Sequence, residues 1–304
     1  MFLTVKEALE VYKNGSVSKA SLPFGQLTVK SILAGLLIGM GAAASSVAAH
    51  SIPNVGLARL AAAVVFPVGL MMVIILGAEL FTGDCLMVLA LPEKKISMKQ
   101  YIHTLAVVFL GNWIGATFLS IMIYFSGQLN YSDGMLGAYT IKVALGKVSL
   151  SAPTAVVSGI LCNILVCAAV LMAICAKDIA GKLLVSFFVI MLFVTAGFEH
   201  CVANMYYITA GMLAKSNPAY AMAAMQQYGL TEADLAMLNI KTFVIDNLVP
   251  VTIGNIIGGA VLLGLSLYYM NMNTDALAKK EGRTIQEVKR KDEYRTGYVA
   301  SVSD

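Results

Sequence analysis

Two short polar peptides that interrupt long apolar stretches contain the residues of this chain best suited to proton and hydrogen-bond chemistry. Residues 77–84 include Glu79 and Thr82, and residues 195–204 include Glu199 and His200. An imidazole titrates near neutral pH, so His200 could pass a proton or a hydrogen bond to a solute, whereas a structural histidine would only tie the broken backbone together. Polar backbone and ionisable side chains persist at mid-membrane depth only where they line a cavity or are buried in protein. Two such breaks, in matching places of two halves, are typical of a solute pathway.

The elements that must position these peptides are membrane-spanning helices. The chain has 304 residues, of which 59% are hydrophobic and 12% charged, and its mean hydropathy is +0.79. A soluble domain carries about twice that share of charge, so we predict an all-α membrane protein. Six spanning units approach the roughly 20 residues that a crossing helix needs, and the second and fifth are long enough for a helix, a turn and a half-helix. The units cover residues 29–51, 57–91, 101–125, 152–175, 179–213 and 243–270.

Basic residues are distributed unevenly between these units. Sixteen of the 21 lysines and arginines fall before or at the start of the first unit, after the second, between the fourth unit and the start of the fifth, or in the tail. By the positive-inside rule, we expect both termini to be cytoplasmic. The first thirty residues have no apolar core ending in a cleavage site, so no cleavable signal is expected. The predicted parts are a cytoplasmic segment 1–28, a transmembrane domain 29–270 and a cytoplasmic tail 271–304 that forms a short, fraying helix from residue 273.

The two halves of the chain indicate an inverted repeat. The breaks lie about 120 residues apart, as do two patches of small residues around Gly35 and Gly159. Three spans per half place the second half upside down relative to the first, and small residues let helices approach closely. Two broken helices related by a pseudo-two-fold axis would then face each other at the midplane.

At these residues the chain resembles the formate/nitrite transporter family. The matching residues are 79–83 (Glu-Leu-Phe-Thr-Gly), 197–205, and Asn163 with Lys147 sixteen positions earlier. The resemblance, which extends from about residue 15 to residue 270, implies a six-helix, aquaporin-like protomer in a homopentamer of a bacterial-type inner membrane. Each protomer would carry its own pore for small monovalent anions of weak acids. In overall sequence the chain is most similar to the hydrosulphide-channel branch, with formate and nitrite as alternative substrates.

The resemblance also implies which side chains line the pore. His200 and Thr82 would face each other in a central chamber. Asn163 could add an amide donor there, although Thr82 could instead cap a half-helix and Asn163 could instead bond a neighbouring helix. Apolar constrictions would strip water from the solute, which opposes a bare anion far more than its neutral acid. The outer constriction comprises Phe66, Leu70 and Phe193, and the inner one Leu80, Phe81 and Val166, although ordinary helix packing would also explain such residues.

Charged residues complete the expected site. By resemblance, Lys147 lies near the outer entrance, and Lys19 is its counterpart on the inner side. Both would raise the local anion concentration, although a loop lysine is ordinarily solvated surface. For Glu79 and Glu199 we favour a structural role over a proton relay, with each carboxylate accepting from free backbone N–H groups at a half-helix end. Asp84 is predicted to be a helix cap.

Other functions find less support in the sequence. A channel for water or small neutral solutes is the second interpretation of an aquaporin-like architecture, and osmotic water flow would reveal it. No nucleophile–base set, metal-ligand cluster or nucleotide-binding loop is recognisable, so we expect neither an enzyme nor a cofactor or metal. The basic tail indicates topology rather than nucleic-acid binding. The five cysteines lie in or beside apolar segments and are expected to be packing residues.

Overall fold

The computed structural model describes residues 2–271, which form helices joined by turns and loops, apart from an isolated antiparallel bridge between Phe2 and Ala176. The predicted all-α membrane fold is therefore confirmed. Residues 1–265 form one compact unit and residues 266–304 a second, of which α14 (Ser266–Met270) and Asn271 are described. The helix predicted from residue 273 lies outside the described residues. Six helices are long and apolar enough to cross a membrane: Phe24–Ala49, Val55–Leu76, Met98–Phe125, Ala152–Cys175, Ile179–Ala196 and Thr242–Met270.

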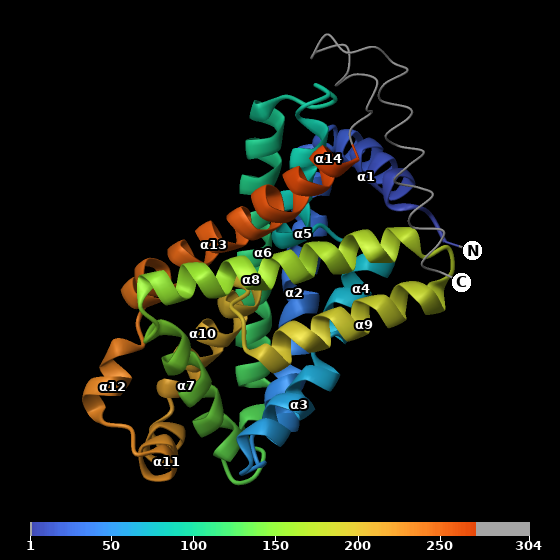
Figure 1. The fold of residues 1–304 in the computed structure, drawn as a ribbon. Helices are drawn as coiled ribbons and strands as arrows, with labels where there is room; N and C mark the ends of the chain where they lie inside the picture. Colours follow the sequence, from blue (N-terminus) through green and yellow to red (C-terminus); the bar gives the residue numbers. More distant parts are fainter. Residues whose placement is uncertain (1, 272–304) are drawn as a thin grey trace, which may run out of the picture. The chain divides into compact units, whose positions relative to one another are not determined.

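The order of the elements repeats across the two halves of the chain (Figure 1). The first half comprises α1 (Val5–Ala20), α2 (Phe24–Ala49), α3 (Val55–Val65), α4 (Val68–Leu76), α5 (Phe81–Asp84), the 3-10 helix η1 (Cys85–Ala90), α6 (Met98–Phe125) and the 3-10 helix η2 (Gln128–Asn130). The second half comprises α7 (Met135–Val148), α8 (Ala152–Cys175), α9 (Ile179–Ala196), α10 (Cys201–Lys215), α11 (Pro218–Tyr228), α12 (Glu232–Met237), the π-helix η3 (Thr242–Leu248), α13 (Val249–Ile256) and the π-helix η4 (Ile257–Leu265).

Both predicted breaks are present, and each begins at a left-handed glycine. Helix α4 gives way to Gly77, with φ +66°, and α9 gives way to Gly197, with φ +76°. A residue with a Cβ is strained at these angles, so glycine allows the helix to end there. The two breaks differ beyond this point. Helix α10 continues for 15 residues, whereas α5 has four residues and passes directly into the tighter η1.

Helix packing supports the predicted inverted repeat. Helix α2 packs along α6, and α8 packs along α13 in the same way, as the paired ribbons of α8 and α13 show in Figure 1. A Cβ at Gly35 would lie 2.0 Å from the Asn112 carbonyl oxygen, and one at Gly159 would lie 2.7 Å from the Val251 carbonyl oxygen. The small-residue patches therefore bring the backbones of the two helices of each pair into close approach, as predicted.

Helix α1 is attached to the first break and to the loop that follows it. The Tyr12 hydroxyl donates to the Gly83 carbonyl over 2.8 Å. Lys13 forms ion pairs with Glu10 and Glu93, and Lys95 contacts the same two carboxylates. The hydrogen bond from Lys13 is the main reason why the pKa of the Glu10 carboxyl lies below its usual range. Helix α1 therefore belongs to the same compact unit as the breaks.

Candidate functional site

Two buried asparagines hold the breaks in the same conformation. Asn112 on α6 accepts from the Phe81 backbone N–H over 2.9 Å and donates to the carbonyls of Glu79 and Ser31. Asn255 on α13 accepts from the Cys201 N–H over 2.9 Å and donates to the carbonyls of Glu199 and Gly159. Each asparagine thus satisfies backbone groups that the end of a helix leaves free in an apolar interior.

His200 and Thr82 meet between the two breaks. The His200 Nε2 and Thr82 Oγ1 atoms are 3.0 Å apart, and both residues are buried. His200 is also the N-cap of α10, because its Nδ1 accepts from the Ala203 N–H over 3.1 Å. Since Nδ1 is an acceptor, the proton of a neutral ring resides on Nε2, which donates to Thr82. The Thr82 hydroxyl hydrogen then remains available to a solute.

Asn163 lies beside this pair but does not offer it an amide donor. Its Nδ2 donates to the carbonyls of Thr82 and Asn255, at 3.1 and 2.7 Å. The Cys167 thiol donates to the same Thr82 carbonyl over 3.2 Å. Both N–H bonds of Asn163 are therefore directed at backbone oxygens. Of the two roles open to it from the sequence, the structure shows the bond to neighbouring elements.

The carboxylate of the second break belongs to a buried polar network. Lys147 Nζ lies 3.0 and 3.2 Å from the two Glu199 carboxylate oxygens, and Asn204 donates to Glu199 Oε2 over 2.6 Å. Asn204 also donates to Asn247, whose amide donates to the Lys147 carbonyl. The sequence predicts free backbone N–H groups as the partners of this carboxylate. The structure provides a lysine and an amide instead, because Asn255 already occupies the Cys201 N–H.

The first break has an equivalent arrangement of charges. Lys19 Nζ lies 2.6 Å from Glu79 and 2.5 Å from Asp84, and Lys30 Nζ lies 3.6 Å from Glu79. Glu79 therefore also pairs with lysines rather than with backbone N–H groups, since Asn112 accepts from Phe81. The prediction that Asp84 caps a helix is wrong. Its side chain makes no capping hydrogen bond, and its carboxylate faces Lys19.

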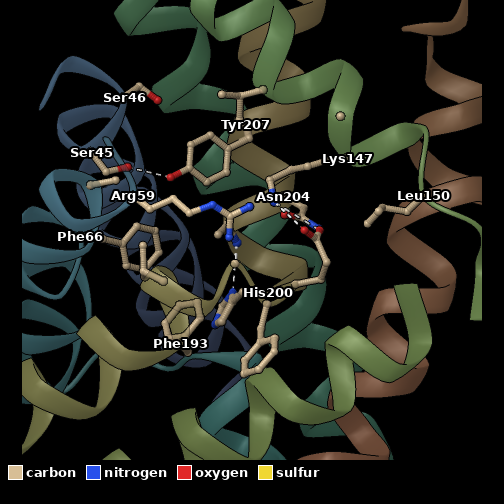
Figure 2. A pocket seen from close by; sticks show the side chains of 18 of the residues that line it. Ser45, Ser46, Arg59, Phe66, Lys147, Leu150, Phe193, His200, Asn204 and Tyr207 are labelled. Carbon is tan, nitrogen blue, oxygen red and sulfur yellow. Dashed lines mark hydrogen bonds and ion pairs between the residues drawn. The ribbon is translucent and has the colours of Figure 1, made fainter. Parts of the chain in front are cut away.

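Two cavities approach the His200–Thr82 pair. The His200 cavity, of about 380 Å³, is bordered by His200, Phe66, Phe193 and Tyr207 and by the charged residues Arg59, Lys147 and Glu199 (Figure 2). The Glu79 cavity, of about 320 Å³, is lined by Leu70, Leu80 and Tyr12 and by the charged residues Lys19, Lys30, Glu79, Asp84 and Lys182. Thr82 borders neither cavity and is 0% exposed. Two charged cavities therefore end at a buried, apolar barrier that contains one polar pair.

Known proteins share this helical fold. The model of the formate/nitrite transporter family matches residues 6–269. This chain belongs to that family. Formate channel FocA of Haemophilus influenzae is 40% identical over 217 residues, which cover 71% of this chain and 75% of FocA. A solved pentameric formate channel with formate bound has a TM-score of 0.75 and 31% identity, and the match covers 82% of this chain and 98% of that one. A solved FNT family ion channel has a TM-score of 0.73 and 27% identity, covering 87% and 98%. The family predicted from the sequence is thus confirmed.

The six residues expected to form the two constrictions lie in three separate places in the structure. Phe66 and Phe193 lie edge to face with ring centroids 5.6 Å apart, and Phe193 stacks on His200 at 6.1 Å. Leu70, which the resemblance groups with these rings, borders the Glu79 cavity together with Leu80. Phe81 packs edge to face on Phe109 of α6, and neither Phe81 nor Val166 borders a cavity.

Replacing Phe193 with alanine tests whether this ring limits passage. Because the ring borders the His200 cavity and stacks on the imidazole, its removal should raise anion flux about threefold or more and admit larger anions such as acetate. Flux into proteoliposomes measures the effect. Phe188→Ala on the same helix, at a position that is 58% exposed, is the matched control and should leave flux unchanged. A fall in flux of the Phe193 variant alone would identify the ring as packing rather than a gate.

Three residues of the site were not predicted from the sequence: Asn112, Asn255 and Arg59. A signal for the asparagines was present, because Gly-Asn-x-Ile-Gly occurs at residues 111–115 and again at 254–258. Arg59 gave no comparable signal, since it is a single basic residue near the start of the second spanning unit. Among residues 2–271, no group of three or more histidine, cysteine or carboxylate side chains is arranged to hold a metal ion.

Proposed function

We propose that this member of the formate/nitrite transporter family is a homopentameric channel for small monovalent anions of weak acids, with one pore per protomer and formate as its main substrate. Two relatives support the substrate and the assembly: one is named a formate channel, and the other is a solved pentameric formate channel with formate bound. The observation on this chain that carries the proposal is the buried His200–Thr82 pair between two cavities.

Passage requires the anion to leave water at the apolar barrier. Burial of an unpaired charge is very costly, whereas the neutral acid of a small anion crosses at modest cost. At this point the chain offers two donors to a carboxylate: the Thr82 hydroxyl and, when it turns from Thr82 to the solute, the His200 Nε2–H. Such donors lower the cost of dehydration and hold the solute at the barrier.

His200 acts in this proposal mainly as a hydrogen-bond donor. A doubly protonated imidazole would lose the bond that Nδ1 accepts from the Ala203 N–H, and a positive ring is disfavoured at the N-terminus of α10. The ring therefore takes up a second proton only when the cap opens. The Thr82 hydroxyl can turn toward the solute without any movement of the backbone.

Hydrosulphide and nitrite stay predictions for the same pore. Hydrosulphide follows from the overall sequence similarity, and its conjugate acid is small, apolar and formed near neutral pH. No contact in the described residues selects sulphur over a carboxylate. Formate is the favoured substrate because two of the relatives described above are named as formate channels.

The positive-inside distribution of lysines supports an orientation with both termini cytoplasmic, in an inner membrane of bacterial type. In this orientation α1 and the Glu79 cavity face the cytoplasm, and the His200 cavity faces outward. Protease protection of tags placed at each terminus, in sealed inverted and right-side-out vesicles, tests this assignment.

The proposed substrates can be compared directly in proteoliposomes. Uptake of formate, nitrite and hydrosulphide is measured under matched gradients, with empty vesicles as the blank and osmotic shrinkage as the assay for water. We expect formate uptake well above the blank and water flow equal to it. Sulphide uptake without formate uptake would move the substrate to hydrosulphide, and water flow alone would favour the neutral-solute channel.

A further inference from the structure

The two lysines expected to attract anions are already paired with carboxylates. In the His200 cavity, Lys147 Nζ contacts both oxygens of Glu199. In the Glu79 cavity, Lys19 Nζ contacts Glu79 at 2.6 Å and Asp84 at 2.5 Å. A cation held this closely by a carboxylate contributes little net potential to the water beside it. The positive charge that a passing anion meets must therefore come from other side chains.

One cation in each cavity has no carboxylate partner. Arg59 of α3 forms no ion pair with any described residue, and its guanidinium points at the carbonyl oxygens of Thr195 and Ala196, at 3.5 and 3.4 Å. Lys182 of α9 borders the Glu79 cavity and likewise forms no ion pair with a described residue. Figure 2 shows the Arg59 side chain reaching into the His200 cavity from the side opposite Lys147.

The charge balance of the two cavities is the same. The His200 cavity has two cations, Arg59 and Lys147, against the single carboxylate of Glu199. The Glu79 cavity has three cations, Lys19, Lys30 and Lys182, against the two carboxylates of Glu79 and Asp84. Each cavity therefore keeps one net positive charge. Carbonyl dipoles orient the Arg59 guanidinium, but they carry no formal charge that would cancel it.

The inverted repeat relates the two unpaired cations. Arg59 lies eighteen residues before the left-handed Gly77, and Lys182 lies fifteen residues before the left-handed Gly197. The difference of three residues is close to one helical turn, so both side chains emerge from nearly the same face of equivalent helices. Because the halves are inverted, the two positions lie on opposite sides of the barrier.

We propose that Arg59 and Lys182 are the residues that recruit the permeating anion, one in each cavity, while Lys147 and Lys19 hold the carboxylates of the breaks in place. This proposal rests on the proposed anion-channel function. A charge in a water-filled cavity with low-dielectric walls concentrates counter-ions by focusing the field. The recruited ligand is a small monovalent anion such as formate, which the unpaired cation retains at the mouth of the barrier.

Arg59 could alternatively act only as a cap for the last carbonyls of α9. Gly197 leaves space for it, because a Cβ there would lie 2.3 Å from Arg59 Nη1. The two roles require different properties of the side chain. A cap needs a donor, which glutamine retains, whereas recruitment needs the positive charge, which lysine retains.

The experiment measures formate uptake from each side separately. Right-side-out and inverted vesicles are prepared from cells without another formate transporter, and initial rates are recorded against formate concentration. For Arg59→Gln, we expect the half-saturating concentration to rise about fivefold for entry from the His200 side, with the maximal rate changed less than twofold. Lys182→Gln should produce the same change only for entry from the Glu79 side. Arg59→Lys should restore the wild-type value.

Ionic strength and control variants separate recruitment from structural effects. The fivefold difference in half-saturating concentration between variant and wild type should nearly disappear when ionic strength rises from about 0.01 M to about 0.5 M, because salt screens the unpaired charge. Lys241→Gln and Lys177→Gln remove charges that border neither cavity and should behave as wild type. Equal half-saturating concentrations for wild type and Arg59→Gln at low salt, or failure of Arg59→Lys to restore the wild-type value, would overturn the proposal. Absence of any anion uptake by the wild-type protein would instead overturn the channel function, and the recruitment proposal with it.

Discussion

Replacement of Asn255 with leucine should destabilise the protein by about 4 kcal/mol. The Cys201 N–H and the Glu199 carbonyl would lose their partner in an apolar interior, and each unpaired buried group costs about 1–3 kcal/mol. Because these groups form the second break, His200 and Glu199 would lose their positions as well. We expect the midpoint of thermal unfolding in detergent to fall by about 10 °C.

The same experiment can be made at Asn112, the equivalent asparagine of the first half. Asn112→Leu removes the equivalent bonds to Phe81, Glu79 and Ser31, so its effect should match that of Asn255→Leu within about 1 kcal/mol. Asn14→Leu is the control, since Asn14 is exposed and accepts only a long bond from Lys95. A midpoint for Asn255→Leu that equals that of the control would show that other groups hold the break.

The membrane fold could be predicted from the sequence because the bilayer leaves few alternatives. Apolar stretches of at least the crossing length must be helices, and the polar peptides around Gly77 and Gly197 must then be breaks that face protein or water. The spans agree with the structure to within a few residues at most ends. The short α5 and the 3-10 helix η1 were not predicted, because residues 85–90 have the same apolar composition as an α-helical half-span.

The site was predictable only in part. His200 and Thr82 were found because polar residues inside an apolar stretch stand out, and the structure brings them to 3.0 Å. The partners of Glu79 and Glu199 were not found, because a sequence does not show that asparagines on other helices already occupy the nearby backbone N–H groups. Arg59 and Lys182 were counted as loop or interfacial charges. Their importance follows from which cations remain unpaired, and this requires three-dimensional contacts.

The paired and unpaired charges have complementary roles on this interpretation. Lys147 and Lys19 form ion pairs with buried carboxylates, and loss of one member of a buried pair costs about 3–5 kcal/mol. These lysines are therefore expected to matter first for folding. A cation that must attract and then release a solute is better left without a fixed carboxylate, as Arg59 and Lys182 are.

Replacement of His200 with asparagine should change the pH dependence of transport while the pentamer still assembles. The asparagine Oδ1 can accept from the Ala203 N–H, and asparagine is a favoured N-cap, so α10 keeps its first hydrogen bond. The Nε2–H donor that faces Thr82 is lost together with the titrating ring. Loss of a donor to an anion costs about 1.5–3 kcal/mol, so formate uptake should fall about tenfold or more. Uptake into proteoliposomes between about pH 5 and pH 8, with gel filtration of the same sample, measures both effects.

Two further variants separate the cap of His200 from its role in the pore. His200→Leu removes both the ring and the cap, so it should also lower stability by about 1 kcal/mol relative to His200→Asn. Thr82→Val keeps the shape of the side chain but removes the hydroxyl, so uptake should fall while the pH profile of the intact imidazole is retained. If His200→Asn keeps the wild-type pH profile, the titrating group lies elsewhere and His200 serves only to cap α10. A flattened profile in His200→Asn, with a preserved one in Thr82→Val, would locate the proton-sensitive step at the imidazole.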